Sequence, residues 1–408
     1  MNKKVLAMLL AGLVLFTSAS AASMEFTVGG TALKVEKEGE IEEKALEAAP
    51  FINAESRTMV PVRAISEAFG AEVGWDENSR TVTVKKDGVE IKLVIDKNEA
   101  TVNGEVKKLD TCPVIVADRT MVPLRFIGEA LSCNVQYASV TKQILIDDSE
   151  PVLSCGDQTF GFAEFKALYD VFYLGNLENA TSSGMDDAAY GQLVAQIALK
   201  TAENMLWMKA AYPAAVLSAE DIEELRPMTE ETAAVLTGLD GYLALIFEKN
   251  HIASGKPVLR LVQATEDVKA FYEENYVLAK HVLVFDEASA NMIYEKAVSG
   301  ADFDILVAEN GQDTGMLTNP EGYVFTKGEM VAEFEEATFA AAIGEITKPV
   351  KSEFGYHVIQ RLPLPAFSAE QAELVSARIA NAKLEQTEKP KTVMEIETLY
   401  EKLGVNTK

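Results

Sequence analysis

Hydrophobic and polar residues change their spacing along the chain, and these changes divide it into segments of different structure. In residues 25–148, short runs alternate apolar and polar residues between turn residues, which predicts a strand-rich domain with two short helices. In 152–277, and again in 365–408, apolar residues recur at helical spacing, which predicts an all-α domain made from two pieces of the chain. Residues 278–364 mix both patterns and predict an inserted α+β domain, so the chain is expected to be a multidomain α+β protein.

Two copies of a short motif lie in the strand-rich segment. The sequence RTMVPVR begins at Arg57, and RTMVPLR begins at Arg119. Each copy leads into an amphipathic helical pattern and then into two strand patterns, so internal repeats are expected at 51–85 and 113–147. The helices of the two repeats are expected at 64–69 and 126–131.

Turn and cap residues define further elements. Asn103-Gly104 predicts a tight hairpin in the strand-rich domain. The run from Ser218 to Asp221 predicts a capped helix start, because its third helical residue is acidic. The other elements expected in the helical domain are a hairpin at 152–160 and helices at 162–173, 187–211, 229–250, 265–276, 368–384 and 393–403.

Composition and charge narrow the classes of partner. The chain has 408 residues and a formal net charge of −26, so there is no basic surplus for phosphates and no nucleic acid is expected as a partner. Three histidines leave little for a histidine metal centre, and we expect no metal site and no cofactor. His251 is expected at the surface of the helical domain. Of the three cysteines, Cys112 and Cys133 either pair or remain free like Cys155.

The first residues have the three-part pattern of a secretory signal. Lys3 and Lys4 precede an apolar run at 5–16, and small residues follow up to Ala21. We expect residues 1–21 to be removed by cleavage near Ala21, and the mature protein to be secreted or extracytoplasmic, at the cell surface or cell wall. A Cys does not follow the apolar run, so a lipid anchor on such a residue is not expected.

The strand-rich domain resembles a known family. The doubled motif and the Gly74-Trp75-Asp76 turn are similar to the N-terminal domain of copper amine oxidase. The resemblance implies a stalk or attachment module without copper chemistry, since the region 25–148 contains no histidine. Two roles remain open for the repeat arginines, a structural bridge or the binding of an anionic wall polymer. These residues are Arg57, Arg63, Arg119 and Arg125.

The inserted domain carries the motifs that bear on chemistry. They are HVLV from His281, GADF from Gly300, KGEMV from Lys327 and FGYHVI from Phe354. In this order they resemble the parvulin family of peptidyl-prolyl cis-trans isomerases, whose domain has an FKBP-like α+β fold. The helical segments before and after resemble the secreted foldases of the PrsA/SurA kind, in which a parvulin domain interrupts a helical chaperone domain.

The parvulin resemblance implies the site residues. His281 and His357 correspond to the paired histidines on central strands beneath a proline pocket. Asp313 lies where the family has an Asp or a Cys, and the three residues are the expected catalytic set. Rotation about an X-Pro bond breaks no bond, and its barrier is about 18–20 kcal/mol, so a shaped pocket can act without a nucleophile.

The same resemblance implies three substrate-binding residues. Met330 and Phe334 correspond to the apolar wall for the proline ring, and their spacing places them on one face of a helix expected at 330–340. Tyr323 is the third residue. It lies in the stretch 319–325, which departs from the double-glycine pattern of the family at the place of a pocket leucine.

These observations lead to one main hypothesis and two alternatives. The main hypothesis is an exported foldase that isomerises X-Pro bonds in unfolded or partly folded exported polypeptides. The departure at 319–325 allows a holdase without catalysis, and 25–148 allows a surface-attachment protein. A homodimer is a further possibility. The aromatic residues between Phe162 and Tyr173 either pack into a core or line a groove for clients.

Overall fold

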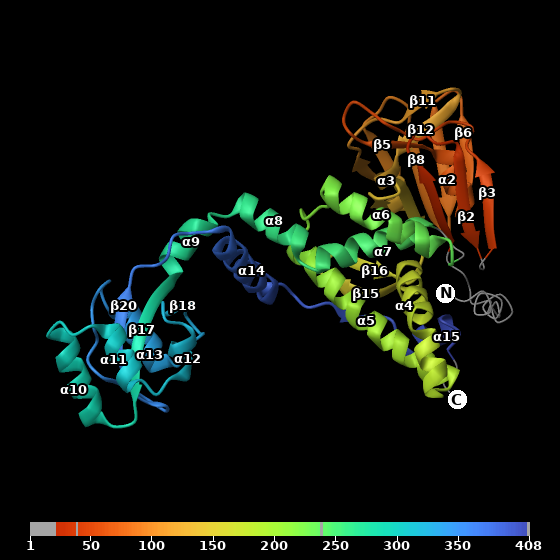
Figure 1. Ribbon diagram of the computed structural model, residues 1–408. Coiled ribbons are helices and arrows are strands. Elements are labelled where there is room, and N and C mark those ends of the chain that lie inside the picture. Colours follow the sequence, from red (N-terminus) through yellow and green to blue (C-terminus); the bar gives the residue numbers. More distant parts are fainter. Residues whose placement is uncertain (1–21, 38–39, 237–239, 406–408) are drawn as a thin grey trace. The chain divides into compact units, whose positions relative to one another are not determined.

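The computed structural model describes residues 22–37, 40–236 and 240–405 (Figure 1). The expected secretory signal at 1–21 lies outside these residues. The chain divides into two compact units, one of Met1–Val258 with Lys383–Lys408 and one of Leu259–Ala382. Within the described parts, no helix is both long enough and apolar enough to cross a bilayer.

Three antiparallel sheets and two short helices form the N-terminal domain, which is part of the first unit. One sheet has the order β13-β14-β1-β2-β3, the second β10-β9-β8-β7-β6 and the third β11-β12-β5-β4. The first contains Asn134–Ala138, Gln143–Asp147, Ser23–Thr27, Ala32–Lys37 and Glu40–Ala45. The second contains Glu105–Lys108, Glu99–Val102, Val89–Val94, Thr81–Lys86 and Glu72–Asp76. The third contains Val114–Val116, Arg119–Pro123, Thr58–Pro61 and Phe51–Ile52.

The two sequence repeats pair with each other at the centre of this domain. Strands β5 and β12 run antiparallel, with Val60 opposite Val122. Each strand ends at a proline, which lacks a donor for the sheet but has a φ suited to a helix start. Helices α2 (Val62–Ala68) and α3 (Leu124–Ala130) therefore follow at once. They begin two residues before the predicted positions, because the proline itself is the cap.

Contacts inside this domain also involve the turn and the arginines of the sequence analysis. Asn103 and Gly104 both have positive φ, of 51° and 83°, so the predicted tight hairpin is confirmed. The Nε of Arg57 lies 2.9 Å from Asp110 Oδ2, and Arg119 pairs with Glu47. Arg63 lies 4.0 Å from Glu67 on its own helix, so these arginines make contacts within the domain.

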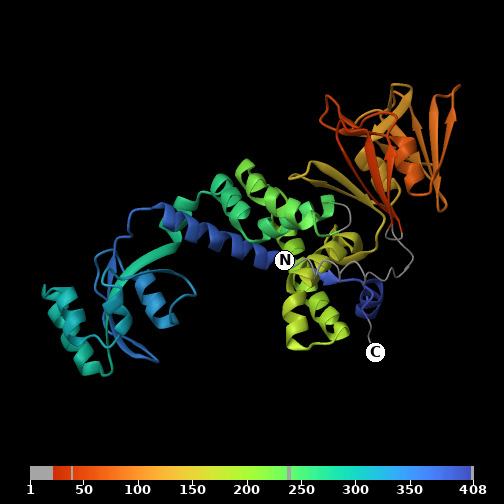
Figure 2. The same cartoon turned by 45° about the vertical axis from the view of Figure 1, so that its right-hand side comes forward.

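A helical domain completes the first unit and combines helices with a small sheet. Helices α4 (Phe162–Ser183) and α5 (Asp187–Ala211) lie side by side (Figures 1 and 2). The sheet order is β16-β15-β21, with Gln158–Gly161, Pro151–Cys155 and Lys391–Thr392. The domain is therefore not purely helical, because a C-terminal segment adds a strand to the predicted hairpin. The other helices of this unit are α6 (Ala219–Ala233), α7 (Asp240–Ala253) and α15 (Ile396–Lys402), whereas α8 (Lys256–Thr265) and α14 (Ala369–Gln386) cross the boundary between the units and lie mostly in the second.

Several predictions for the helical region need correction. The single helix expected at 229–250 is wrong, because α6 continues through Pro227 to Ala233 and α7 begins at Asp240. Packing of the buried Leu225 and Thr229 outweighs the hydrogen bond lost at proline. The helix expected at 265–276 is α9 (Val268–Asn275), and α8 was not predicted.

Burial decides two of the open alternatives. Phe165, Leu168 and Tyr169 of α4 are buried in an apolar cluster with α5 and the hairpin, so the aromatic residues of this helix pack into a core. All cysteines of the described chain carry free thiols. Cys133 and Cys155 are buried and Cys112 is half-buried.

Helix α7 joins the two domains of the first unit. Its Leu245 and Ala244 pack with Val140 and Leu145 of the N-terminal domain. The hydroxyl of Tyr242 on α7 donates to the buried Asp147 carboxylate at 2.8 Å. A carboxylate this deep in the protein needs such donors, because burial without hydrogen bonds is costly.

The second unit is an α+β domain around a four-stranded antiparallel sheet. The order is β18-β17-β20-β19, with Tyr323–Thr326, Tyr276–Val284, Gly355–Leu362 and Val350–Ser352. Helices α10 (Glu287–Val298) and α11 (Phe303–Asn310) pack on one face of the sheet, and α13 (Ala332–Ala340) packs on the other. The short α12 (Thr314–Thr318) precedes β18. Strand β17 begins at Tyr276, two residues before the expected start of this domain, because Tyr276 pairs with Thr326.

The contact of α7 with the N-terminal domain yields a stability prediction. Tyr242→Phe removes a donor from Asp147 and leaves the buried carboxylate with fewer hydrogen bonds. We expect the free energy of unfolding of the first unit to fall by about 1–3 kcal/mol, measured by urea denaturation of the full chain. Tyr137→Phe is the matched control, since Tyr137 is 52% exposed. Equal effects of the two substitutions would contradict the prediction.

Candidate active site

Two histidines meet on one face of the sheet in the second unit. Strands β17 and β20 place Leu283 opposite His357 and His281 opposite Ile359. The two histidines are therefore diagonal neighbours on the same face. Their Nδ1 atoms are 3.0 Å apart, and their rings are buried, with 5% and 4% exposure.

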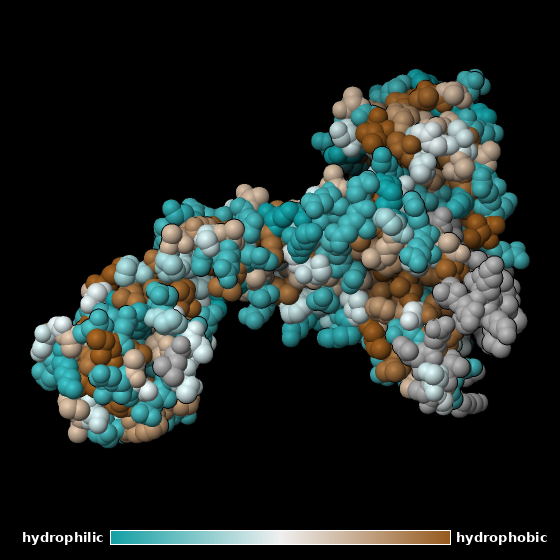
Figure 3. All heavy atoms as spheres, viewed as in Figure 1, coloured by the Kyte–Doolittle hydropathy of each residue, from teal (hydrophilic) through white to brown (hydrophobic). Residues whose placement is uncertain are grey.

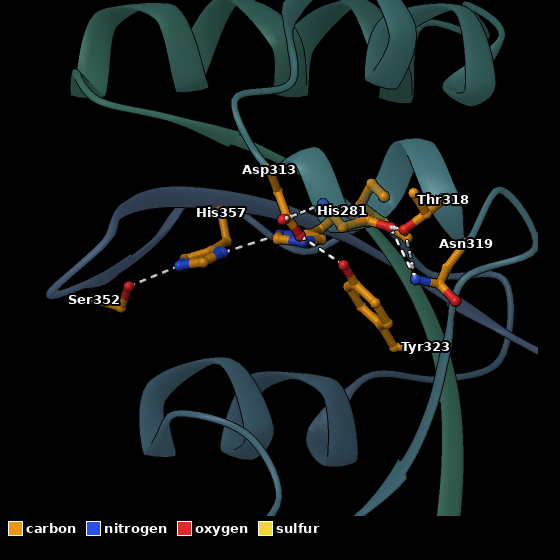
Figure 4. Close-up of polar contacts among 9 residues, drawn as sticks. His281, Asp313, Thr318, Asn319, Tyr323, Ser352 and His357 are labelled. Carbon is orange, nitrogen blue, oxygen red and sulfur yellow. Dashed lines mark hydrogen bonds and ion pairs between the residues drawn. The ribbon is translucent and has the colours of Figure 1, made fainter.

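A continuous chain of hydrogen bonds passes through both rings. Ser352 Oγ lies 2.7 Å from His357 Nε2, and His281 Nε2 lies 2.8 Å from Asp313 Oδ2. Figure 4 shows Ser352, His357, His281 and Asp313 in this order, with the side chains pointing toward one another. Each polar atom of the two imidazoles therefore faces a partner.

Asp313 determines which ring nitrogens carry protons. An ionised Asp313 only accepts, so the proton of a neutral His281 is on Nε2, and its Nδ1 is an acceptor. His357 must then donate from Nδ1 and accept at Nε2 from the hydroxyl of Ser352. The Ser352 oxygen in turn accepts the backbone N–H of Phe354 at 3.1 Å. Every donor and acceptor is thus satisfied with both histidines neutral.

The pKa values agree with neutral histidines. Burial lowers the pKa of His357 to about 4, and the nearby His281 acts in the same direction. Burial also lowers the pKa of His281 below its ordinary value, although the hydrogen bond to Asp313 acts against this shift. The pair therefore presents uncharged rings at neutral pH.

Asp313 is held as an anion at the edge of the cluster. It is the N-cap of α12, and its Oδ1 accepts the backbone N–H of Gly315 at 2.9 Å. Its Oδ2 accepts from His281 and from the hydroxyl of Tyr323, which lies 2.9 Å away. Burial alone would raise the pKa of Asp313, but these hydrogen bonds outweigh it and leave the pKa below the ordinary value. Burial and the carboxylate raise the pKa of Tyr323 to about 12, so its hydroxyl stays protonated and donates.

Aromatic and apolar side chains form the other wall of the cluster. The ring of Phe334 on α13 stands edge-on to both imidazoles, with centroids 5.0 Å from His281 and 5.4 Å from His357. Met330 is half-buried and packs in the same apolar cluster as Phe334. The expected helix at 330–340 is too long, because α13 begins at Ala332. Met330 therefore lies in the segment before the helix, and its placement beside Phe334 does not come from helical spacing.

The structure brings all the expected site residues to one place and adds two more. His281, Asp313, His357, Tyr323, Phe334 and Met330 belong to the hydrogen-bond chain or to the adjoining apolar cluster. Sequence reasoning missed Ser352 and Gly315. Ser352 lies in the same short hairpin as His357, which is a signal that could have identified it.

The departure at 319–325 has a structural explanation. Gly322 has a φ of 100°, and a Cβ there would lie 2.7 Å from the carbonyl oxygen of Ala279. This close approach starts β18, in which Tyr323 pairs with Ala279 of β17. The hydroxyl of Tyr323 therefore reaches Asp313.

His251, the third histidine, lies elsewhere and corrects an expectation. Its Nε2 is 3.0 Å from Asp221 Oδ1, and its side chain is only 12% exposed, so it is not the surface residue expected. Asp221, Glu224 and His251 are the one group in the described chain whose atoms are close enough to share a metal ion. The Asp221 carboxylate also accepts the backbone N–H of Ser218 in the capping box of α6, so a structural hydrogen bond to His251 is sufficient to explain the group.

The neutral pair yields a pH prediction. We expect the signals of His281 and His357, in the full chain with ¹³C-labelled histidine, to titrate with midpoints below the usual 6.5. The variants His281→Asn and His357→Asn assign the signals. Because the folded pKa lies below the unfolded one, this contribution to the stability of the second unit is complete above about pH 6.5 and is lost as the pH falls toward 4. A midpoint at or above 6.5 for either residue would contradict the neutral pair.

Two family models match parts of this chain, and several known proteins are similar to it. Residues 286–362 match the PPIC-type PPIase domain, and residues 40–146 match the copper amine oxidase N-terminal domain. The chain is 42% identical over 101 residues to the foldase protein PrsA of Caldanaerobacter subterraneus subsp. tengcongensis, covering 23% of this chain and 33% of the relative. It is 40% identical over 114 residues to the foldase protein PrsA of Geobacillus kaustophilus, covering 25% and 40%. The solution structure of NmPin, the parvuline of Nitrosopumilus maritimus, is 41% identical with a TM-score of 0.21, covering 22% of this chain and 97% of that one.

These matches confirm the two family resemblances predicted from the sequence. The chain spans a third to two fifths of the length of the PrsA foldases. The PPIC-type match contains Asp313, Tyr323, Phe334 and His357, and His281 lies just before it. The chain therefore carries a PPIC-type parvulin domain, which resembles that of the PrsA foldases, together with a copper amine oxidase N-terminal domain.

Proposed function

We propose that this protein is an exported foldase that catalyses cis-trans isomerisation of X-Pro bonds in unfolded or partly folded exported polypeptides. The observation that carries the proposal is the buried chain of hydrogen bonds from Ser352 to Asp313, set against Phe334 in a parvulin-type domain. The foldase names of the PrsA relatives support the wider role. Export rests on the signal pattern of residues 1–21.

Weakly polar surroundings are the basis of the proposed catalysis. A planar peptide unit has a dipole of about 3.5 D, which depends on delocalisation across the amide. Rotation to the twisted transition state interrupts that delocalisation and reduces the charge separation. A binding surface of neutral imidazoles and aromatic rings then solvates the planar amide less well than water does, and so disfavours it relative to the twisted one. Each 1.36 kcal/mol of such preference is tenfold in rate.

The roles of the individual residues follow from their positions. Met330 and Phe334 form the apolar side that would receive the proline ring, with Tyr323 at the edge. His281 and His357 form the polar but uncharged floor. The Asp313 carboxylate orients His281 and makes the electrostatic potential at the edge of the site negative.

Exposed hydrophobic side chains on the second unit support the binding of unfolded chains. Figure 3 shows apolar residues at its surface among polar ones. Phe285, at 73% exposure, and Phe354, at 56%, are the exposed aromatic residues of this unit. Exposed apolar surface of this kind favours contact with extended apolar segments of other proteins. The net charge of −26 would keep such a protein soluble.

The N-terminal domain has a separate proposed role. We propose that residues 25–148 bind a cell-wall polymer and so hold the foldase at the cell surface. We also propose that the protein forms a homodimer. The arginines Arg57 and Arg119 are 47% and 41% exposed despite their ion pairs, so both could also meet an anionic polymer.

Refolding kinetics provide the test of catalysis. The full chain should accelerate the slow, proline-limited phase in the refolding of a protein with a cis X-Pro bond. Met330→Ala should reduce kcat/KM by roughly tenfold, because it removes apolar surface from the side that receives the proline ring. Met292→Ala is the matched control, since Met292 is 51% exposed on α10 and should leave the rate unchanged.

The result also separates the foldase from a holdase. If the wild-type chain does not accelerate the slow phase, the catalytic proposal fails. If that same protein still prevents aggregation of a denatured client, measured by light scattering, the holdase alternative replaces it.

A further inference from the structure

We propose that Tyr323 is a positioning residue that holds Asp313 against His281, and that Gly315 is required because it leaves space for the tyrosine hydroxyl. The inference concerns the same site as the proposed isomerase and rests on that function only for its kinetic test. Neither residue needs to touch the substrate for this role.

Two donors converge on one oxygen of Asp313. His281 Nε2 lies 2.8 Å and the Tyr323 hydroxyl 2.9 Å from Oδ2, while the backbone N–H of Gly315 occupies Oδ1 at 2.9 Å. A carboxylate that accepts on both oxygens cannot rotate without breaking a bond. The tyrosine is a third donor, and its bond to Oδ2 strengthens the hold on the carboxylate plane and on its alignment with the imidazole.

Tyr323 also lies against the imidazole that it helps to orient. The ring centroids of Tyr323 and His281 are 6.0 Å apart, with 51° between the planes. Strand β18 supplies this position, because Tyr323 pairs directly with Ala279, two residues before His281 on β17. The ring and the hydroxyl thus restrain opposite ends of the same hydrogen bond.

Gly315 allows this arrangement because it has no side chain. A Cβ at this position would lie 2.1 Å from the Tyr323 hydroxyl oxygen, far inside contact distance. Gly315 is not among the glycines with positive φ, so its backbone would suit other residues. The need for glycine here is therefore one of space, and the space is occupied by the hydroxyl group of Tyr323.

This geometry predicts a coupling between the two positions. Removal of the hydroxyl in Tyr323→Phe relieves the closest clash of a Cβ at 315. The remaining neighbours would be Asp313 Oδ1 at 3.0 Å and the ring carbon Cζ at 3.3 Å, which small shifts can accommodate. Gly315→Ala should therefore do more damage in the wild-type chain than in the Tyr323→Phe chain.

The first experiment is kinetic and uses the full chain. Tyr323→Phe should lower kcat/KM in the proline-limited refolding assay by roughly three- to tenfold, the size expected for one hydrogen bond to a charged group. It should also move the acid limb of the pH profile to higher pH, because Asp313 loses a donor that favours its anion. Tyr294→Phe on α10 is the matched control and should change neither quantity. An unchanged pH profile for Tyr323→Phe would overturn the inference.

The second experiment does not depend on catalysis. In ¹⁵N-labelled histidine spectra of the full chain, the ring nitrogen shifts of His281 should report an Nε2–H tautomer. Tyr323→Phe should move these shifts toward a mixture of tautomers, and Gly315→Ala should do the same by displacing the hydroxyl. A double-mutant cycle then compares the thermal unfolding midpoints of the wild type, Tyr323→Phe, Gly315→Ala and the double variant.

The outcomes separate this inference from the proposed function. If the wild type fails to accelerate refolding but the histidine shifts and the unfolding midpoints show the coupling, the isomerase proposal fails and the positioning role stands. If Gly315→Ala lowers the midpoint equally in the wild-type and Tyr323→Phe backgrounds, or the His281 shifts do not change, the positioning role is wrong.

Discussion

The hydrogen bond between the Nδ1 atoms of His281 and His357 is the constraint on which the site depends. Such a bond needs one protonated and one unprotonated nitrogen, so both rings must have fixed tautomers. Asp313 determines the tautomer of His281 and, through it, that of His357, and the Ser352 hydroxyl donates to the nitrogen left as an acceptor. Burial disfavours a charged form of either ring, and the two imidazoles remain a polar but neutral surface beneath Phe334.

The surrounding sheet turns this constraint into a defined geometry. Antiparallel pairing places the histidines diagonally, and the opposite face packs apolar residues against α10 and α11. A shift of one residue in register would move His357 to that apolar face and break the hydrogen bonds that connect Ser352, His357, His281 and Asp313. Strand pairing has a similar role in the N-terminal domain. There the two strands that end in a proline, β5 and β12, pair with each other, and a helix follows each of them. In both places, strand register determines where the important side chains lie.

Predictions from local signals were accurate where the chemistry is local. Asn103-Gly104 and the Ser218 capping box depend on neighbouring residues alone, and both have the expected geometry. The predictions failed where packing overrides a local preference. Helix α6 continues through Pro227, and Met330 reaches the apolar cluster from outside α13. His251 could not be placed from sequence, because its partner Asp221 is on a different helix.

The sequence by itself determined the family resemblances and the strand and helix patterns, because ordered motifs and periodicity are properties of the linear chain. Through the parvulin resemblance it also predicted a set of site residues: His281, Asp313, His357, Met330, Phe334 and Tyr323. Only the tertiary structure decided how these residues are connected. The register of the strands places Ser352 at one end of the row of hydrogen bonds. At the other end it places the hydroxyl of Tyr323 on Asp313, in the space left by Gly315. Hydrogen-bond direction and steric space depend on distances in three dimensions, and the pairing of β17, β18, β19 and β20 sets those distances.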